Sequence, residues 1–466
     1  MKQIRAAFAG MRSFATLWSG QVVSQFGSGL TSFGLGVWIF EQTHSASLFG
    51  LIIVAAAVPG LLLMPVSGVL VDRNDRRRVI VAADAGAALV TAALAALAFS
   101  GRLAVWNICA GVALVMACAE LRMLAMGASV ALMVPRESLG RAAGLLQTGM
   151  SATQVVSPVL AGVLLPVIGL QGLLLIDLAT YLAAVGATLA VRIPRPAGPD
   201  PRRAGGEGFA RDLGFGWRWI ARRPALLGLL AFFTVFFFAH SMTAVLFTPL
   251  VLAFTTPAGL GAVVSVGSVG GLLGGLAMSA WGGPKRRVAG AVLAAAGIGA
   301  SMMLAGVRPS VPAAAAGFFG MFFLTPFLVG SLQVVWQTKT PPEVQGRVFA
   351  VRRMIPNLAA VPAFALAGVL ADRVFEPLLM PGGPLAATLG EVVGVGAGRG
   401  TGLLFMLAGV VPIAAALAAW ASPRIRRVEE ELPDALPAAP PPAAAPAPPA
   451  EPPSRGPAAG AEPAFA

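Results

Sequence analysis

The sequence predicts an all-α integral membrane protein, with twelve transmembrane helices arranged as two six-helix pseudo-repeats. Of its 466 residues, 57% are hydrophobic and 11% are charged, whereas an average soluble domain is roughly 25% charged. A transmembrane helix needs about 20 apolar residues, and an internal repeat divides the chain in two. The predicted spans are 14–40, 48–71, 79–100, 104–134, 142–167, 170–191, 224–254, 258–281, 288–306, 311–337, 349–371 and 400–421.

The first apolar stretch follows the basic residues Lys2, Arg5 and Arg12. It is too long for the apolar core of a signal peptide, so we expect a membrane helix. Later loops alternate in basic content, with 28 Arg and Lys residues on the side of the N-terminus and 4 on the other. The positive-inside rule then predicts a multi-pass protein of a bacterial-type cytoplasmic (inner) membrane, with both termini cytoplasmic. The net charge of +13 reflects this topology, and we expect no nucleic-acid partner.

Between the sixth and seventh spans, Phe209, Leu213, Trp217 and Ile220 share one helical face among arginines. This pattern is typical of an amphipathic helix on the inner leaflet. The end of the chain is rich in Ala and Pro and poor in large side chains, so we expect disorder there. The predicted regions are an N-terminal half (1–191), an inter-half loop with the amphipathic helix (192–223), a C-terminal half (224–423) and a disordered cytoplasmic tail (424–466).

The two halves share sequence in one register. Pro-Arg-Glu-Ser-Leu-Gly-Arg at 135–141 recurs as Pro-Pro-Glu-Val-Gln-Gly-Arg at 341–347, and Ala-Gly-Val-Leu at 161–164 recurs at the same offset at 367–370. A constant offset indicates two parallel six-helix repeats, related by an axis along the membrane normal. In such repeats the substrate site lies near the midplane, between the halves.

The loop after the second span, Gly-Val-Leu-Val-Asp-Arg-Asn-Asp-Arg-Arg-Arg at 68–78, resembles the Gly-x-Leu-x-Asp-Arg-x-Gly-Arg-Arg signature of the major facilitator superfamily. It departs from that signature at Asp75, where the family has Gly. The resemblance implies a breakable inner latch between helices, since charge-assisted hydrogen bonds contribute roughly 1.5–3 kcal/mol. The alternative is a solvated loop that only sets topology. The latch candidates are Asp72, Arg73, Arg76 and Arg77. A similar stretch at 368–373 falls on the opposite membrane face, and we interpret that likeness as coincidence.

In the fifth span, residues 153–162 are similar to the Gly-x-x-x-Gly-Pro-x-x-Gly-Gly motif of exporters in this superfamily. The resemblance implies close packing that seals the outer side, and the alternative is ordinary small-residue helix packing. The outer-gate candidates are Ser157, Pro158, Ala161 and Gly162. Segments 18–21, 280–287 and 346–353 look most like the macrolide and siderophore exporter branch, whose members are of the drug:proton antiporter type.

Ionisable residues within the spans are the next candidates, because a charge near the bilayer centre is costly unless it meets water or a partner. Glu120 and Arg122 lie deep in the fourth span. Two positions apart, they do not face each other. One is expected to face the cavity, while the other could meet Asp84 of the third span. They are either a substrate-specific feature or structural residues, and Glu120 is our first candidate for proton coupling or cation recognition.

His240 in the seventh span is either a hydrogen-bonded packing residue or a second coupling candidate. The family architecture implies that the first, fourth, seventh and tenth spans line the central cavity. The side chains there that suit a bulky amphiphile are Gln21, Gln25, Gln333, Trp336 and Gln337.

The sequence contains no Gly-x-Ser-x-Gly, no His-Glu-x-x-His, no His/Cys cluster and no phosphate-binding Gly-x-x-x-x-Gly-Lys loop. We therefore predict no enzyme, no metal site and no cofactor, with a proton gradient as the energy source. The predicted function is alternating-access, proton-coupled efflux of hydrophobic or amphiphilic compounds, such as macrolide-like drugs or secondary metabolites. The alternatives are a small-solute importer of the same fold and a siderophore or natural-product exporter, with a membrane-embedded enzyme less favoured. Expected partners are the bilayer, the amphiphile and protons, and we expect a monomer.

Overall fold

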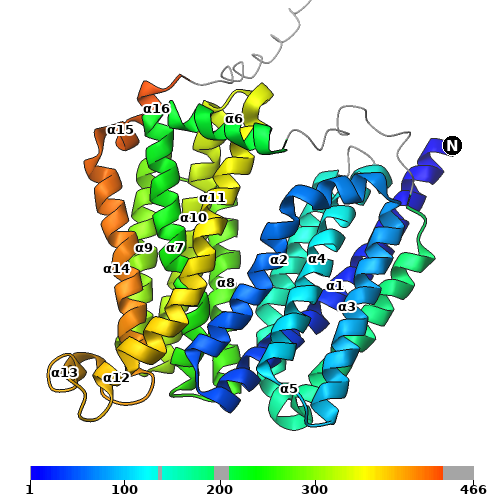
Figure 1. Ribbon diagram of the computed structural model, residues 1–466. Coiled ribbons are helices and arrows are strands. Elements are labelled where there is room, and N and C mark those ends of the chain that lie inside the picture. Colours follow the sequence, from blue (N-terminus) through cyan, green and yellow to red (C-terminus); the bar gives the residue numbers. More distant parts are fainter. Residues whose placement is uncertain (1, 135–138, 194–208, 434–466) are drawn as a thin grey trace, which may run out of the picture.

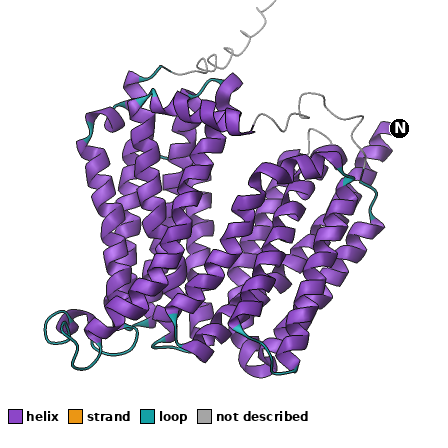
Figure 2. Ribbon diagram, in the orientation of Figure 1, coloured by secondary structure: helices purple, strands orange, loops and turns teal. Residues whose placement is uncertain are grey.

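The computed structural model describes residues 2–134, 139–193 and 209–433, and these residues form helices and no strand (Figures 1 and 2). The first half contains α1 (Lys2–Thr43), α2 (Ala46–Arg73), α3 (Arg76–Phe99), α4 (Val105–Met133) and α5 (Leu139–Ala190). After α6 (Phe209–Ala221), the second half contains α7 (Pro224–Leu252), α8 (Pro257–Trp281), α9 (Arg287–Val307), α10 (Val311–Lys339), α11 (Pro342–Leu370), a π-helical turn (Ala371–Phe375), α12 (Glu376–Leu379), α13 (Gly390–Val393) and α14 (Arg399–Ala421). The short helices α15 (Pro423–Arg426) and α16 (Val428–Glu431) follow.

Ten helices of the described chain are long and apolar enough to cross a membrane. One of them, α5, holds two of the predicted spans, because the backbone at Gly169 leaves the helical region with φ 67° and the chain turns back. Trp18 Nε1 donates to the carbonyl oxygen of Leu145, 3.0 Å away, while Ala187 packs on Gly20. The two ends of α5 therefore lie beside the same part of α1. With α5 counted twice and α1 included, the predicted twelve-span architecture is confirmed.

The spans form two bundles that stand side by side (Figure 1). The N-terminus, α6 and α15 lie at one end, which we call the inner end after the predicted topology; α12 and α13 lie at the other, the outer end. In Figure 1 the ribbons of the two bundles approach each other at the outer end and diverge toward the inner end. The amphipathic segment forms α6, which packs on α11: Gly216 contacts the carbonyl oxygen of Arg347, and the Arg347 guanidinium lies 4.9 Å from the ring centroid of Phe215.

The predicted tail boundary at 424 is too early. Residues 423–431 form α15 and α16, and the carboxylate of Glu429 accepts hydrogen bonds from the backbone N–H groups of Arg287 (2.9 Å) and Val288 (3.1 Å). A carboxylate stabilises a helix N-terminus, where backbone donors are otherwise unpaired. Lys339 Nζ also donates to the carbonyl oxygen of Glu429. Residues 434–466 of the predicted tail, the segments at 135–138 and 194–208, and Met1 lie outside the described residues.

Candidate functional site

A polar network joins three helices of the N-terminal half. Asp84 of α3 is fully buried, and its Oδ1 lies 3.2 Å from Arg122 of α4. Its Oδ2 accepts a 2.7 Å hydrogen bond from Gln21 Nε2 of α1, and Arg122 also reaches Ser24 Oγ at 3.4 Å. Both carboxylate oxygens thus have partners, as a buried charge requires. The structure places Arg122 against Asp84, and this pair holds α1, α3 and α4 together.

Glu120 points elsewhere. It lines a cavity of about 260 Å³ between the halves, together with Gly60 of α2, Phe237 of α7 and two residues of α11, Arg353 and Asn357. Within the described part of the chain, no hydrogen bond or ion pair of Glu120 is found. A half-buried carboxylate without a hydrogen bond, in a cavity bounded by both halves, is a candidate for a functional role, and Arg353 is the basic side chain that lines the same cavity.

In the tenth span, Gln333 and Trp336 contact α11, whereas the sequence predicts that they line the central cavity. Gln333 Oε1 accepts a 2.7 Å hydrogen bond from Arg352 of α11, whose guanidinium also lies 5.4 Å from the ring centroid of Trp336. The Trp336 side chain is 1% exposed, so in this conformation it packs in the core and offers no free aromatic face. Gln337 is exposed and Gln25 is half-buried.

His240 stacks on Phe236 of its own helix, with ring centroids 5.6 Å apart. Its Nδ1 is buried and has no hydrogen-bond partner within the described chain. The hydrogen bond that a packing role would supply is therefore not made by Nδ1 of His240 in the described structure. The stacking favours an apolar contact in this conformation.

The inner latch is only partly described. The side chains of Asp72 and Arg73 lie outside the described residues, although both belong to α2. Arg77 donates from Nε to the carbonyl oxygen of Thr188 at 3.1 Å and thereby ties α3 to the end of α5. Asp75 is the N-cap of α3, and its Oδ1 accepts a 3.0 Å hydrogen bond from the N–H of Arg77. The backbone φ of Asp75 is −64°. Because this φ is negative, the turn does not require glycine at position 75. The Asp75 side chain instead caps the start of α3.

Two of the four outer-gate candidates, Pro158 and Gly162, lie at an interface between the halves. Gly162 and Pro158 of α5 face the start of α8, where a Cβ on Gly162 would lie 2.8 Å from the carbonyl oxygen of Pro257. A Cβ on Gly261 would lie 2.3 Å from the carbonyl oxygen of Pro158. Ser265 Oγ donates to the carbonyl oxygen of Val155 at 2.5 Å. Ser157 and Ala161 are buried against α1 of the same half instead: Ser157 Oγ donates to the carbonyl oxygen of Phe26 at 3.4 Å, and Ala161 packs with Leu30.

A second inter-half contact was missed by the sequence reasoning. Asp372 of the C-terminal half caps the N-terminus of α2, with its oxygens accepting from the N–H groups of Ala46 (2.9 Å) and Ser47 (2.8 Å) and from Ser45 Oγ (2.6 Å). Gly368, one turn earlier, allows this approach, since a Cβ there would lie 2.4 Å from the carbonyl oxygen of Ala46. The likeness of 368–373 to 68–73, interpreted as coincidence, was the available signal.

Taken with the ribbons in Figure 1, these contacts describe one state of the molecule. The described hydrogen bonds between the halves run from the outer end, where Asp372 of the π-helical turn caps α2, to the middle of α8, where Ser268 Oγ donates to the carbonyl oxygen of Gln154 at 2.9 Å. The bundles diverge toward the inner end. In this arrangement the halves are joined from the outer end to mid-depth.

Comparison with known proteins agrees with this architecture. The family model of the Major Facilitator Superfamily matches residues 17–364. Macrolide efflux protein A of Streptococcus pyogenes is 28% identical over 371 residues, which cover 78% of this chain and 90% of that protein. Multidrug efflux pump Tap of Mycolicibacterium fortuitum is 26% identical over 369 residues, covering 74% and 86%.

The fold also matches solved structures. A bacterial homolog to the human lysosomal transporter Spinster, in an inward-facing and unoccupied conformation, aligns with a TM-score of 0.61 and 15% sequence identity. The alignment covers 88% of this chain and 97% of that chain. At this identity the likeness shows the fold alone.

Proposed function

The chain belongs to the Major Facilitator Superfamily, and from that premise we propose that it exports hydrophobic or amphiphilic compounds by alternating access, coupled to inward proton flow. It is a membrane transporter and not an enzyme. We place it in a cytoplasmic (inner) membrane with both termini in the cytoplasm, in accord with its basic inner loops.

The observation that carries the proposal is the pairing of a free carboxylate with a breakable outer closure. Glu120 lies in the cavity between the halves, while Asp372 and the Gly162 interface hold the outer ends together. These closing contacts are hydrogen bonds and close packing, which can be broken and remade in each transport cycle. The inward-opening state then takes up substrate from the inner side, and the opposite state releases it outside.

Proton coupling is assigned to Glu120 because it can change charge without exposing a buried partner. Asp84 is bound to both Arg122 and Gln21, so its carboxylate is part of the structure of the N-terminal half. Glu120 makes no such ion pair, and Arg353 is the basic side chain among the described lining residues of its cavity. Protonated from the outside and deprotonated toward the inside, it would move one proton inward per cycle and attract a cationic substrate when ionised.

The substrate class follows from the cavity walls and from the relatives. The cavity that holds Glu120 is also lined by Phe237, Phe364, Ala360 and Val361, and Arg353 is its basic residue. Aromatic and aliphatic walls with one acidic and one basic group suit an amphiphile. Two similar proteins are named for macrolide and multidrug efflux, and a macrolide-like compound is the substrate we propose here.

The test is accumulation in a pump-deficient bacterium that expresses the full chain. Cells should accumulate less of a radiolabelled macrolide or a lipophilic cationic dye than cells with an empty vector, and a protonophore should restore accumulation. The control is Glu120→Gln at equal abundance in the membrane, which should behave like the empty vector. Energy-dependent uptake across the panel would overturn export and favour the importer.

A further inference from the structure

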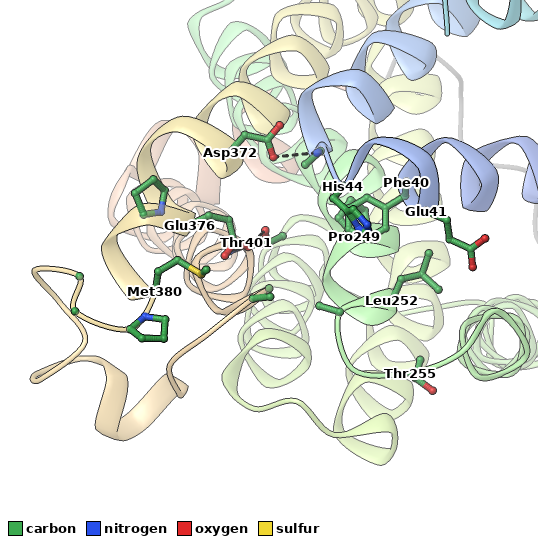
Figure 3. A pocket seen from close by; sticks show the side chains of 18 of the residues that line it. Phe40, Glu41, His44, Pro249, Leu252, Thr255, Asp372, Glu376, Met380 and Thr401 are labelled. Atoms are coloured by element: carbon green, nitrogen blue, oxygen red, sulfur yellow. Dashed lines mark hydrogen bonds between the residues drawn. The ribbon is translucent and has the colours of Figure 1, made fainter. Parts of the chain in front are cut away.

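The outer end contains a larger cavity than the one around Glu120. It has a volume of about 950 Å³ and is walled by both halves (Figure 3). Phe40, Glu41 and His44, at the end of α1, come from the N-terminal half. Leu252 of α7 and Met380, which follows α12, come from the C-terminal half. We call this cavity the outer vestibule; its volume is in the range of sites that hold drug-sized ligands.

Carboxylates dominate the charge of the outer vestibule. Glu41, Asp372 and Glu376 line it, and no Lys or Arg is among its described lining residues. His44 is the remaining titratable group in the lining, and the guanidinium of Arg399 lies behind the wall, within electrostatic range of Glu376. The cavity is therefore acidic on balance.

Asp372 and Glu376 differ in how many of their carboxylate oxygens accept hydrogen bonds from the protein. Both oxygens of Asp372 accept hydrogen bonds from the start of α2. Glu376 uses only Oε1, which accepts from Thr401 Oγ1 at 2.6 Å and from its N–H at 3.1 Å. Its Oε2 is buried and has no hydrogen-bond partner in the described structure. A buried carboxylate oxygen without a partner calls for a donor or a cation.

The apolar part of the lining defines what else a ligand must offer. Phe40, Leu252 and Met380 present rings and alkyl groups beside the carboxylates, and Pro249 and Pro377 add rigid apolar surface. A hydrated metal ion would leave these surfaces in contact with water. An organic cation with a large apolar body would cover them while its charge meets Glu376 or Glu41.

We propose that the outer vestibule is a binding site for organic cations with an apolar body, separate from the cavity of Glu120, and that a bound cation holds the outer end closed. The two cavities share no lining residue. Because the vestibule walls come from both halves, a ligand that contacts both walls binds best when the outer ends are together. Differential affinity of this kind shifts the equilibrium toward the inward-opening state. An organic cation outside the membrane would then slow transport; this second part rests on the proposed transport function, whereas the binding part does not.

Binding is tested with propidium, a membrane-impermeant organic cation, titrated by fluorescence anisotropy against the purified full-length protein in nanodiscs. Glu41→Gln and Glu376→Gln should each weaken binding about three- to fivefold, since a partly exposed ion pair is worth that much. Glutamine retains the Oε1 acceptor for Thr401, so the local fold is preserved. The matched control Glu391→Gln, on α13 outside the lining, should leave affinity unchanged.

Three results would overturn the site. Unchanged affinity in both vestibule variants would show that propidium does not bind in the outer vestibule. An equal loss in Glu391→Gln would show that it responds only to general surface charge, and loss of binding in Glu120→Gln alone would place it in the central cavity.

Inhibition is measured separately, as efflux from spheroplasts with propidium outside. It should slow the wild type, and Glu376→Gln should need about three- to fivefold more propidium for the same inhibition. Binding without inhibition would overturn the second part. Because anisotropy requires no transport, failure of the proposed function and failure of this site are distinguishable.

Discussion

At the scale of the residue, the environment of each intramembrane carboxylate separates structure from function. Asp84 has a partner on each oxygen, from Arg122 and Gln21, while Glu120 faces a cavity without one. Asp372 bridges the halves. All three are acidic residues in apolar segments, and only their neighbours assign them different roles.

Replacing Glu120 by Gln should abolish the response of transport to an imposed pH gradient, because glutamine cannot release a proton. The protein should remain folded and abundant, since Glu120 has no partner to lose. Uptake of a dye into inside-out vesicles, with and without a pH gradient, measures this. Normal pH-driven transport would remove Glu120 from coupling and direct attention to His240.

Asp84→Asn should destabilise the protein by about 3 kcal/mol, because it leaves the charge of Arg122 buried without its counter-ion. Thermal unfolding in detergent should show a lower midpoint. The control is the double variant Asp84→Leu/Arg122→Met, which removes both charges and should recover most of the loss. An unchanged midpoint in Asp84→Asn would show that Arg122 finds another partner or water.

Asp372→Asn should loosen the outer closure about tenfold in population, because a charged cap at a helix N-terminus contributes on the order of 1–2 kcal/mol. The measurement is labelling of Ser265→Cys by an impermeant maleimide from outside, in a chain with Cys109 and Cys118 replaced by Ala. Labelling should accelerate in Asp372→Asn and not in the neighbouring control Arg373→Gln. Equal rates in all three proteins would show that the cap does not limit opening.

At the scale of the element, helix packing is decided by where glycines allow backbone contact. The pair α5–α8 meets through Gly162 and Gly261, each of which would place an added Cβ within 3 Å of a backbone oxygen of the other half. Gly169 instead lets α5 reverse, because its positive φ suits glycine. Within α5, Gly162 thus allows close helix contact and Gly169 allows the chain to turn, and the spacing of the glycines does not distinguish these roles.

Gly261→Ala should hold the outer end apart and lower transport severalfold, because the new methyl group would lie 2.3 Å from the Pro158 carbonyl oxygen. Gly275→Ala is the matched control on the same helix, since no atom lies within 4 Å of its added Cβ. Efflux rates at equal protein abundance compare the two. Equal activity would mean that the α5–α8 contact adjusts without cost.

At the scale of the whole molecule, the charge pattern and the bundle geometry agree. The N-terminus and α15 lie at the same end of the molecule, as an even number of crossings requires (Figure 1). The sequence division assigns 28 of the Arg and Lys residues to that side and 4 to the other.

A topology reporter fused after Arg424 should therefore read cytoplasmic. A reporter inserted at Gly382, in the loop after α12, should read external and serves as the matched control. Cytoplasmic signal at Gly382 or external signal at Arg424 would contradict the twelve-span arrangement.

The number of spans and the two-fold repeat were determined by the sequence alone, and their orientation is predicted by it, because each depends on local properties. A bilayer requires about 20 apolar residues per span, loop charge sets orientation, and a repeat is visible as a constant offset. The reversal at Gly169 and the Asp75 cap required backbone geometry, since a residue type permits several turns.

Only the tertiary structure decided which charged groups are paired and which are free. Asp84 meets Arg122 because α3 and α4 are packed at one rotation and depth, and a small change in either would separate them. Asp372 caps α2 across more than three hundred residues of chain. Such contacts depend on the relative placement of distant helices, which hydropathy and motif spacing do not specify, and for that reason the outer closure was visible only after folding.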